Sequence, residues 1–415
     1  MNIRETKIAN GLTVVTDKMA GNQIISIGVF VNIGSVNEND SQAGASHFLE
    51  HMMFKGTKTR SAFQIANEME EVGGAMNAYT DKEVTAYYAR VLKRDIKLAL
   101  SIIADITQNS IMNAEEFARE KDVIVQEIKM IDDMPDAIIF DKFQEKCYDG
   151  RRLGKPISGT EDSVRSMTTQ DLLNYMTKYT ADKIVLAASG DIEHDDFVAL
   201  ANEYMSNIKP TGDSDVEKQT YCGGCTYIER ALGQSHMVMG FEGVSYMDPS
   251  IYAVRVAKVI LGDGMSSRLF QEIREKRGLA YSVSSFRCGY RDTGMFGVRA
   301  GCNDDKVTDV IKLSLAELNK MKTDITKEEL ERAKAQIKVS ELSNLETSID
   351  RVCYVATQLL LMKRVLTPLE VIKKIDDVTI DDVAASIERI TKTPPTLAVI
   401  GSGHDVEALY GNFAK

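Results

Sequence analysis

Two histidines and a glutamate stand within five residues near the start of the chain. His47 and His51 are four positions apart, and Glu50 immediately precedes the second histidine. Positions i and i+4 of a helix share one face, so both imidazoles could reach the same point. Zinc favours imidazole nitrogen, and a catalytic zinc has three protein ligands and one position open to water. The segment therefore predicts two ligands of a zinc site, beside a carboxylate that could take a proton from water.

A third ligand must come from elsewhere in the chain. The helix-like segment 116–127 offers Glu120 and Glu127, which would lie on one helix face about two turns apart. One carboxylate could bind the metal while the other orients a metal ligand. The pattern does not choose between them, and taken alone both could be solvated charges on an amphipathic helix.

The elements that position these residues are recognisable from their periodicity. β-Branched residues predict strands at 11–16 and 25–31, and two further strands within 75–92 joined by a turn near Asp81. Apolar residues at helical spacing indicate mostly helix from 94 to about 147. Ser46 is the expected N-cap of the helix that carries the two histidines.

Features of the first half of the sequence return in the second half at one constant spacing. Each copy has a threonine, an aspartate three positions later, a helix-like run and an apolar strand that ends in glycine. The matched residues are Thr168, Asp171, Leu172 and Gly190 in one copy and Thr379, Asp382, Val383 and Gly401 in the other. We therefore predict two related domains, at residues 1–209 and 221–415, joined by a polar linker at 210–220. Strands flanked by runs of helices indicate α+β halves with mixed or antiparallel sheets.

The overall composition excludes several classes of protein. Apolar residues make up 44% and charged residues 27%, and no apolar run approaches the ~18 residues of a membrane-spanning helix. The formal net charge of −11 argues against a nucleic-acid partner. Six scattered cysteines and a start without an apolar signal region predict a cytoplasmic location.

Other residues that could carry chemistry are interpreted as structural. Cys222 and Cys225 form a lone CxxC pair without a second pair to complete a metal site. The remaining histidines, His194, His236 and His404, are isolated in the sequence. We expect packing or surface roles for all five residues.

The stretch 44–57 around the two histidines resembles the M16 (pitrilysin-type) metallopeptidases, which carry the inverzincin order H-x-x-E-H. It is most similar to the processing-peptidase-like M16B branch. Segment 73–85 resembles the edge strand of that family, and segment 269–283 resembles its paired arginine and tyrosine. Glu127 stands where the family has its third zinc ligand, and Glu120 stands where the family has a further glutamate seven residues earlier.

The resemblance implies a role for each of these residues at the metal. His47, His51 and Glu127 would hold one Zn²⁺ per chain, which stays net positive and can acidify water. Glu50 would be the general base, and Glu120 would support catalysis by orienting a metal ligand.

The resemblance also implies how substrate is bound. Asn77 and Ala78 would present an edge strand to the backbone of an extended peptide. Arg274 and Tyr281 would reach the active site from the other half, with donors for a substrate carbonyl or oxyanion. The implied fold has two homologous α/β-roll halves that form a clamshell, a zinc-binding catalytic domain at 1–209 and a substrate-binding domain at 221–415.

The expected function is that of a zinc-dependent endopeptidase that hydrolyses unfolded peptides or precursor segments in a closed chamber. The alternative is a non-catalytic or partner-dependent subunit of a heteromeric M16-type processing complex. Retention of His47, Glu50, His51 and Glu127 favours the first interpretation. We expect a homodimer or a heterodimer with a paralogue, and no membrane or nucleic-acid partner.

Overall fold

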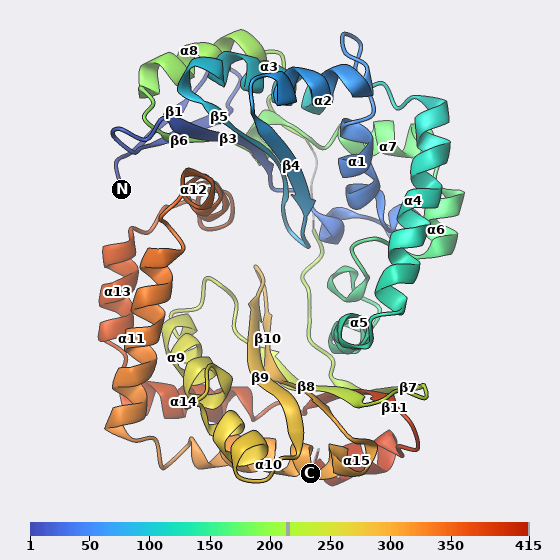
Figure 1. Cartoon of the computed structure of the whole chain (residues 1–415), viewed down its shortest axis with the longest axis vertical. Coiled ribbons are helices and arrows are strands. Elements are labelled where there is room, and N and C mark those ends of the chain that lie inside the picture. The colour runs from blue at the N-terminus through green and yellow to red at the C-terminus, as the bar shows by residue number, and fades with distance from the viewer. Residues whose placement is uncertain (213–215, 414–415) are drawn as a thin grey trace. The chain divides into compact units, whose positions relative to one another are not determined.

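Two compact units make up the computed structural model, which describes residues 1–212 and 216–413 (Figure 1). Unit 1 comprises Met1–Lys129, Pro156–Glu217 and Leu342–Thr367. Unit 2 comprises Met130–Lys155, Lys218–Glu341 and Pro368–Lys415. Each unit therefore includes a segment from the other half of the sequence. Residues 213–215 of the predicted linker lie outside the described residues.

Unit 1 is built on a six-stranded mixed sheet with the order β1-β2-β6-β3-β5-β4. Neighbouring strands are antiparallel except β2 and β6, which are parallel. The strands are β1 (Ile3–Lys7), β2 (Thr13–Lys18), β3 (Ile24–Val31), β4 (Ala75–Thr80), β5 (Thr85–Leu92) and β6 (Ile184–Gly190). The strands predicted at 11–16, at 25–31 and within 75–92 are confirmed as β2, β3, β4 and β5.

Helices cover both faces of this sheet. Alternate residues of β3 show the two faces: Ile27 and Val29 belong to the core under α3 and α8, whereas Phe30 packs with α12. The helices are α1 (Ala45–Met53), α2 (Ala62–Glu71), α3 (Ile96–Asn109), α4 (Ala114–Asp132), α6 (Glu161–Ser166), α7 (Thr169–Met176), α8 (His194–Met205) and α12 (Ser348–Met362). The helical stretch predicted from 94 to about 147 is confirmed as α3, α4 and α5 (Pro135–Cys147).

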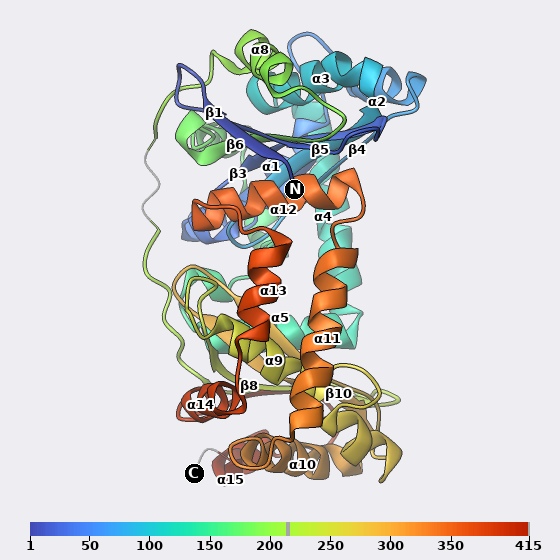
Figure 2. The same cartoon turned by 90° about the vertical axis from the view of Figure 1, so that its left-hand side faces the viewer.

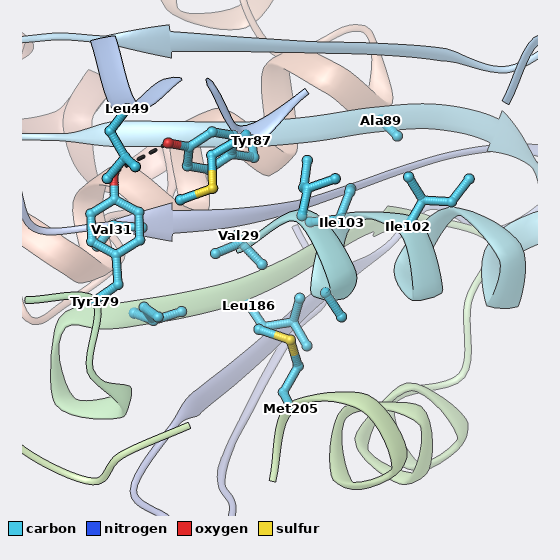
Figure 3. Packing of buried hydrophobic residues seen from close by; sticks show 14 of the residues in the cluster. Val29, Val31, Leu49, Tyr87, Ala89, Ile102, Ile103, Tyr179, Leu186 and Met205 are labelled. Atoms are coloured by element: carbon cyan, nitrogen blue, oxygen red, sulfur yellow. Dashed lines mark hydrogen bonds between the residues drawn. The ribbon is translucent and has the colours of Figure 1, made fainter. Parts of the chain in front are cut away.

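One part of the unit 1 core lies between the sheet and helices α3 and α8. Figure 3 shows side chains from β3, β5, β6, α3 and α8 in this core, among them Val29, Ile103 and Met205. The hydroxyls of the buried Tyr87 and Tyr179 form a hydrogen bond of 3.2 Å, so burial leaves neither hydroxyl without a partner.

Polar contacts attach α12 to its face of the sheet. The Arg351 guanidinium donates two hydrogen bonds, of 2.6 and 3.0 Å, to the fully buried Asp17 carboxylate on β2. Ser348 and Ser26 of β3 share a buried hydrogen bond of 2.8 Å. A helix from the C-terminal half of the sequence is thus an integral part of unit 1.

Unit 2 is built on a five-stranded sheet with the order β7-β11-β8-β10-β9. The strands are β7 (Gly224–Glu229), β8 (Ser235–Gly243), β9 (Ala280–Gly289), β10 (Gly294–Cys302) and β11 (Thr396–Gly401). The helices are α5 (Pro135–Cys147), α9 (Ile251–Gly262), α10 (Val307–Lys320), α11 (Lys327–Ser343), α13 (Pro368–Asp376), α14 (Ile380–Ile390) and α15 (Val406–Phe413), with a π-helical segment at Phe270–Glu275.

The two units repeat one topology. The run β7-β11-β8-β10-β9 has the same order and the same strand directions as β2-β6-β3-β5-β4, including the one parallel pair. Thr168 and Thr379 cap α7 and α14 in the same way: each hydroxyl accepts a hydrogen bond from the backbone N–H of the aspartate three positions later, at 3.2 and 3.1 Å. Each hydroxyl also donates a hydrogen bond of 2.6 Å to the carboxylate of that aspartate. The prediction of an α+β fold with two related halves is confirmed.

The repeated helices α5 and α12 are exchanged between the sequence halves. α12 packs on β2, β3 and β6 of the first sheet (Figure 2). α5 packs on the matching strands β7, β8 and β11 of the other sheet (Figure 1). Packing units and sequence halves therefore differ by these segments, and the division at 210–220 stays a prediction about the repeat. Within residues 1–212 and 216–413, no helix has the length and apolar character that crossing a membrane requires.

Candidate metal centre

The helix that carries the two histidines begins differently from the sequence prediction. Its N-cap is Gly44, with φ of 91°, and the expected cap Ser46 lies inside the first turn. The Glu38 carboxylate, only 3% exposed, accepts hydrogen bonds of 2.8 Å from the backbone N–H groups of Gly44 and Ser46. The preceding loop therefore supplies the cap. Local sequence signals missed Glu38 because its contact depends on how that loop folds back.

Position 44 also requires glycine for steric reasons. A Cβ there would lie 2.7 Å from the carbonyl oxygen of Ser158, and the positive φ already disfavours other residues. α1 is further attached through Ser46, whose hydroxyl hydrogen-bonds the Tyr175 hydroxyl of α7 at 2.6 Å. The start of the helix is thus fixed on two sides.

Apolar contacts hold α4 against α1 so that their polar faces meet. The rings of Phe48 and Phe117 stack with centroids 4.6 Å apart and an interplanar angle of 11°. Ile124 and Val125 of α4 are fully buried in the same core. The burial of these residues sets the rotation of α4, so that the face that carries Glu120 and Glu127 lies toward α1.

Three donor atoms converge between the two helices. Glu127 Oε2 lies 3.7 Å from His47 Nε2 and 3.5 Å from His51 Nε2, and one ligand atom of each residue lies within 4.8 Å of the others. Two ligands about 2.1 Å from a tetrahedral zinc are separated by about 3.4 Å. Two imidazoles and a carboxylate at these separations fit zinc. In the part of the chain that the structure describes, no other group of three such residues converges.

Glu120 contacts a histidine instead of the point of convergence. Its carboxylate accepts hydrogen bonds from His51 Nδ1 at 2.9 Å and from Lys55 Nζ at 2.7 Å. Burial alone would raise the pKa of Glu120, but these two bonds outweigh it and lower that pKa. An ionised Glu120 accepts a hydrogen bond from the Nδ1–H group of His51. Nε2 is then the ring nitrogen that is free to bind a metal.

The two histidines have opposite protonation preferences. Burial, helped by the charge of His51, lowers the pKa of His47 to about 4, so His47 is neutral near pH 7, the form that binds a metal. Burial also opposes the charge of His51, but the bond to Glu120 and the charge of Glu127 raise its pKa overall. His47 Nδ1 is buried without a hydrogen-bond partner among the described residues, whereas its Nε2 faces Glu127.

Glu50 lies on the same helix and is held by a residue that the sequence interpretation missed. Thr80, the last residue of β4, donates a hydrogen bond of 2.6 Å from its hydroxyl to Glu50 Oε2. Burial raises the pKa of Glu50, and the bond from Thr80 partly offsets this rise. Thr80 stands in the segment that resembles the family's edge strand, but only the packing of β4 against α1 shows its contact.

Asn77 and Ala78 lie on the outermost strand of the first sheet. Among the strands of residues 1–212 and 216–413, β4 pairs with β5 alone and ends the strand order. Asn77 is exposed, and its side-chain oxygen accepts a hydrogen bond of 2.8 Å from the backbone N–H of Ala78. This free strand edge runs beside the helix that carries Glu50.

Arg274 and Tyr281 both belong to unit 2. Arg274 lies in the π-helical segment, and Tyr281 is the second residue of β9, with 74% of its surface exposed. The Arg274 guanidinium lies over the Tyr281 ring, 4.9 Å from its centroid. The pair is thus brought together, and its approach to the metal residues stays a prediction.

The residues interpreted as structural have ordinary surroundings. His194 is buried, with its ring nitrogens 2.8 and 2.9 Å from the hydroxyls of Thr6 and Thr16. His404 Nε2 lies 2.7 Å from the Ser235 hydroxyl. Cys222 and Cys225 are free thiols.

Comparison with known proteins places this geometry in a family. The family Insulinase (Peptidase family M16) matches residues 13–161, and the family Peptidase M16 inactive domain matches residues 166–337. An uncharacterized zinc protease of Rickettsia felis is 39% identical over 406 residues, which are 96% of this chain and 98% of the relative. Mitochondrial-processing peptidase subunit beta of Saccharomyces cerevisiae is 32% identical over 420 residues, covering 96% and 91%.

Solved structures share the fold at lower sequence identity. A protease from Helicobacter pylori superposes with a TM-score of 0.90 at 22% identity, covering 96% of this chain and 99% of that one. The structure titled peptidase M16 inactive domain from Pseudomonas fluorescens gives 0.89 at 20% identity, covering 97% and 98%. Together with relatives that align along nearly their whole length, the two family matches show that this chain belongs to peptidase family M16.

Proposed function

We propose that the chain is an active zinc-dependent endopeptidase that hydrolyses extended or unfolded peptides and precursor segments. The observation that carries the proposal is the convergence of His47, His51 and Glu127 next to the carboxylate of Glu50. Relatives named zinc proteases support the identity of the metal. We therefore propose one Zn²⁺ per chain, held by the three converging residues.

Glu50 is the proposed proton acceptor. Bound zinc would supply Lewis-acid chemistry to water and to the scissile carbonyl. Thr80 fixes Glu50 Oε2, and Oε1 has no hydrogen-bond partner among the described residues, so Oε1 can take the proton of the attacking water. A pKa raised by burial suits a base that later returns the proton to the leaving amine.

Glu120 is the proposed orienting residue. Its bond to His51 Nδ1 fixes the tautomer and the direction of the imidazole, and Lys55 fixes Glu120 in turn. The charge of Glu120 increases the basicity of His51, which strengthens an imidazole as a metal ligand.

Substrate would bind along the free edge of β4. Main-chain hydrogen bonds to an added strand recognise extended backbone and tolerate many side chains. Asn77 and Ala78 lie on this edge, on the strand that supplies Thr80 to Glu50. Completion of the site by Arg274 and Tyr281, hydrolysis in a closed chamber, dimerisation and a cytoplasmic location stay predictions.

Metal analysis and peptide cleavage test the proposal together. We expect bound zinc, cleavage of an internally quenched peptide, and loss of cleavage with a chelator that added zinc reverses. Glu50→Gln should keep zinc and lower turnover by about 10²–10⁴-fold, because it removes the proton acceptor without removing a ligand. The matched control is Glu115→Gln, which changes an exposed carboxylate of α4 and should leave both measurements unchanged.

Each contrary outcome has a definite meaning. A purified chain without zinc affinity would contradict the metallopeptidase assignment. Turnover of Glu50→Gln at the parent rate would contradict the assignment of the base. Bound zinc with cleavage only after addition of a second protein would favour the partner-dependent alternative.

A further inference from the structure

One pocket of unit 2 is lined by none of the residues assigned to the peptidase site. Its volume is about 400 Å³, and its walls come from α9, β9 and α11, all labelled in Figure 1. The side chains that matter for its chemistry are Arg255, Lys258, Val259, Arg287, Gln336 and Ile337. Small-molecule sites have volumes of about 300–1,000 Å³, so the pocket can hold a small organic ligand.

Two of its three cations already have partners. Arg255 forms an ion pair with Glu341, and Lys258 forms one with Asp263. No ion pair or hydrogen bond joins the guanidinium of Arg287 to another residue within 1–212 and 216–413. The pocket therefore has one net positive charge, centred on Arg287.

The surroundings of Arg287 make an external acceptor favourable. Burial, and after it the charge of Arg255, lowers the pKa of Arg287, which shows that its charge is poorly compensated. Arginine stays protonated in proteins, so the cost cannot be avoided by losing the proton. Buried charges are normally paired, and a planar guanidinium matches a carboxylate with two parallel hydrogen bonds.

The rest of the pocket selects among anions. One uncompensated charge suits a monoanion better than a dianion, because a dianion would introduce an excess negative charge. Val259 and Ile337 are 9% and 5% exposed and offer apolar surface to the body of a ligand. We propose that this pocket binds a small organic monocarboxylate with a short apolar chain, whose carboxylate pairs with Arg287.

Calorimetric titration of the full-length chain at constant ionic strength tests the proposal. The probe is hexanoate, with hexanamide as its neutral counterpart and inorganic phosphate as the competing anion. We expect saturable binding of hexanoate, and at least about 10-fold weaker binding of hexanamide, because a neutral amide loses the charge-assisted hydrogen bonds to the guanidinium. Phosphate should bind more weakly than hexanoate.

Three variants locate the binding. Arg287→Met should weaken hexanoate binding at least about 10-fold. The matched control is Arg299→Met, which removes an exposed arginine of the adjacent strand β10 and should leave binding unchanged. Gln336→Glu places a negative charge at the exposed rim of the pocket on α11. This variant should weaken binding several-fold, because the new carboxylate repels the carboxylate of the ligand.

The outcomes separate clearly. Equal binding of hexanamide and hexanoate, or equal losses in Arg287→Met and Arg299→Met, would overturn the proposal. Tighter binding of phosphate would overturn the choice of a monocarboxylate. If Arg287→Met does not fold by circular dichroism, Gln336→Glu decides, since its site is exposed: undiminished affinity would overturn the proposal, and reduced affinity would support it.

Discussion

Replacement of Glu38 tests whether one buried carboxylate holds the start of the metal-binding helix. In Glu38→Ala, the backbone N–H groups of Gly44 and Ser46 lose acceptors 2.8 Å away in a buried setting. An unsatisfied buried donor costs about 1–3 kcal/mol, so two cost about 2–6 kcal/mol. That is a large part of the ~5–15 kcal/mol that stabilises a typical domain. The loss should loosen the first turn of α1 and weaken zinc binding by His47 and His51.

Comparison of the parent with Glu38→Gln tests how the free energy of unfolding depends on pH, and the pKa of Glu38 gives the sign of that dependence. Burial raises the pKa of Glu38 from 4.5 to about 7. When the pKa of a carboxyl is higher in the folded than in the unfolded protein, the protonated group stabilises the fold fully below the unfolded pKa. This contribution to the free energy of unfolding is lost as the pH rises through the folded pKa. Glutamine has no such dependence. The parent should therefore lose stability relative to Glu38→Gln between pH 4.5 and 7, by up to about 3 kcal/mol.

Urea unfolding of the zinc-free chain at pH 5 and pH 8 measures both effects. Far-ultraviolet circular dichroism is the suitable signal, because the chain has no tryptophan. Glu5→Gln is the matched control, since Glu5 is an exposed carboxylate of β1 in the same unit. A parent-to-Gln difference that is equal at the two pH values would refute the reasoning about burial. A cost below about 0.5 kcal/mol in Glu38→Ala would refute the capping role.

Three further predictions concern the site itself. Glu120→Gln should weaken zinc binding about 10–100-fold in a competitive chelator titration, because His51 loses an ionised acceptor; unchanged affinity would contradict the orienting role. Thr80→Val removes a bond that lowers the pKa of Glu50, so the acid limb of the pH–kcat/KM profile should move to higher pH with zinc content unchanged; a shift to lower pH would contradict it. Arg274→Ala and Tyr281→Phe should lower turnover without releasing zinc, because neither is a proposed ligand; metal loss in either variant would argue against the assignment.

The sequence predicted residues whose roles depend on type and spacing. His47, Glu50 and His51 share one short helix, so local geometry alone brings them together. The choice between Glu127 and Glu120 needed either the family resemblance or the packing of α4 on α1. Both carboxylates lie on one face of α4, and the packing of Phe117, Ile124 and Val125 in the core sets how that face meets α1, with Glu127 near both imidazoles and Glu120 at His51 Nδ1.

Residues missed by the sequence interpretation act through contacts between distant segments. Glu38 reaches the start of α1 from the preceding loop, and Thr80 reaches Glu50 from β4. Neither residue belongs to a local motif that demands its partner. Ser46 was a reasonable cap by type, but the helix begins one residue earlier, at Ala45, where Glu38 accepts from the amides of Gly44 and Ser46, and the Ser46 hydroxyl instead hydrogen-bonds Tyr175.

The exchange of α5 and α12 shows why a repeat in sequence does not define a unit of packing. Val15 and Phe30 of the first sheet, with Val185 and Ala187, form their core with α12. A chain ending at residue 209 would expose this apolar face to water and leave the buried Asp17 without Arg351. An uncompensated buried carboxylate costs about 3–5 kcal/mol, in addition to the lost apolar burial. The half of the sequence that carries all three converging ligand residues therefore depends on a helix from the other half for its stability.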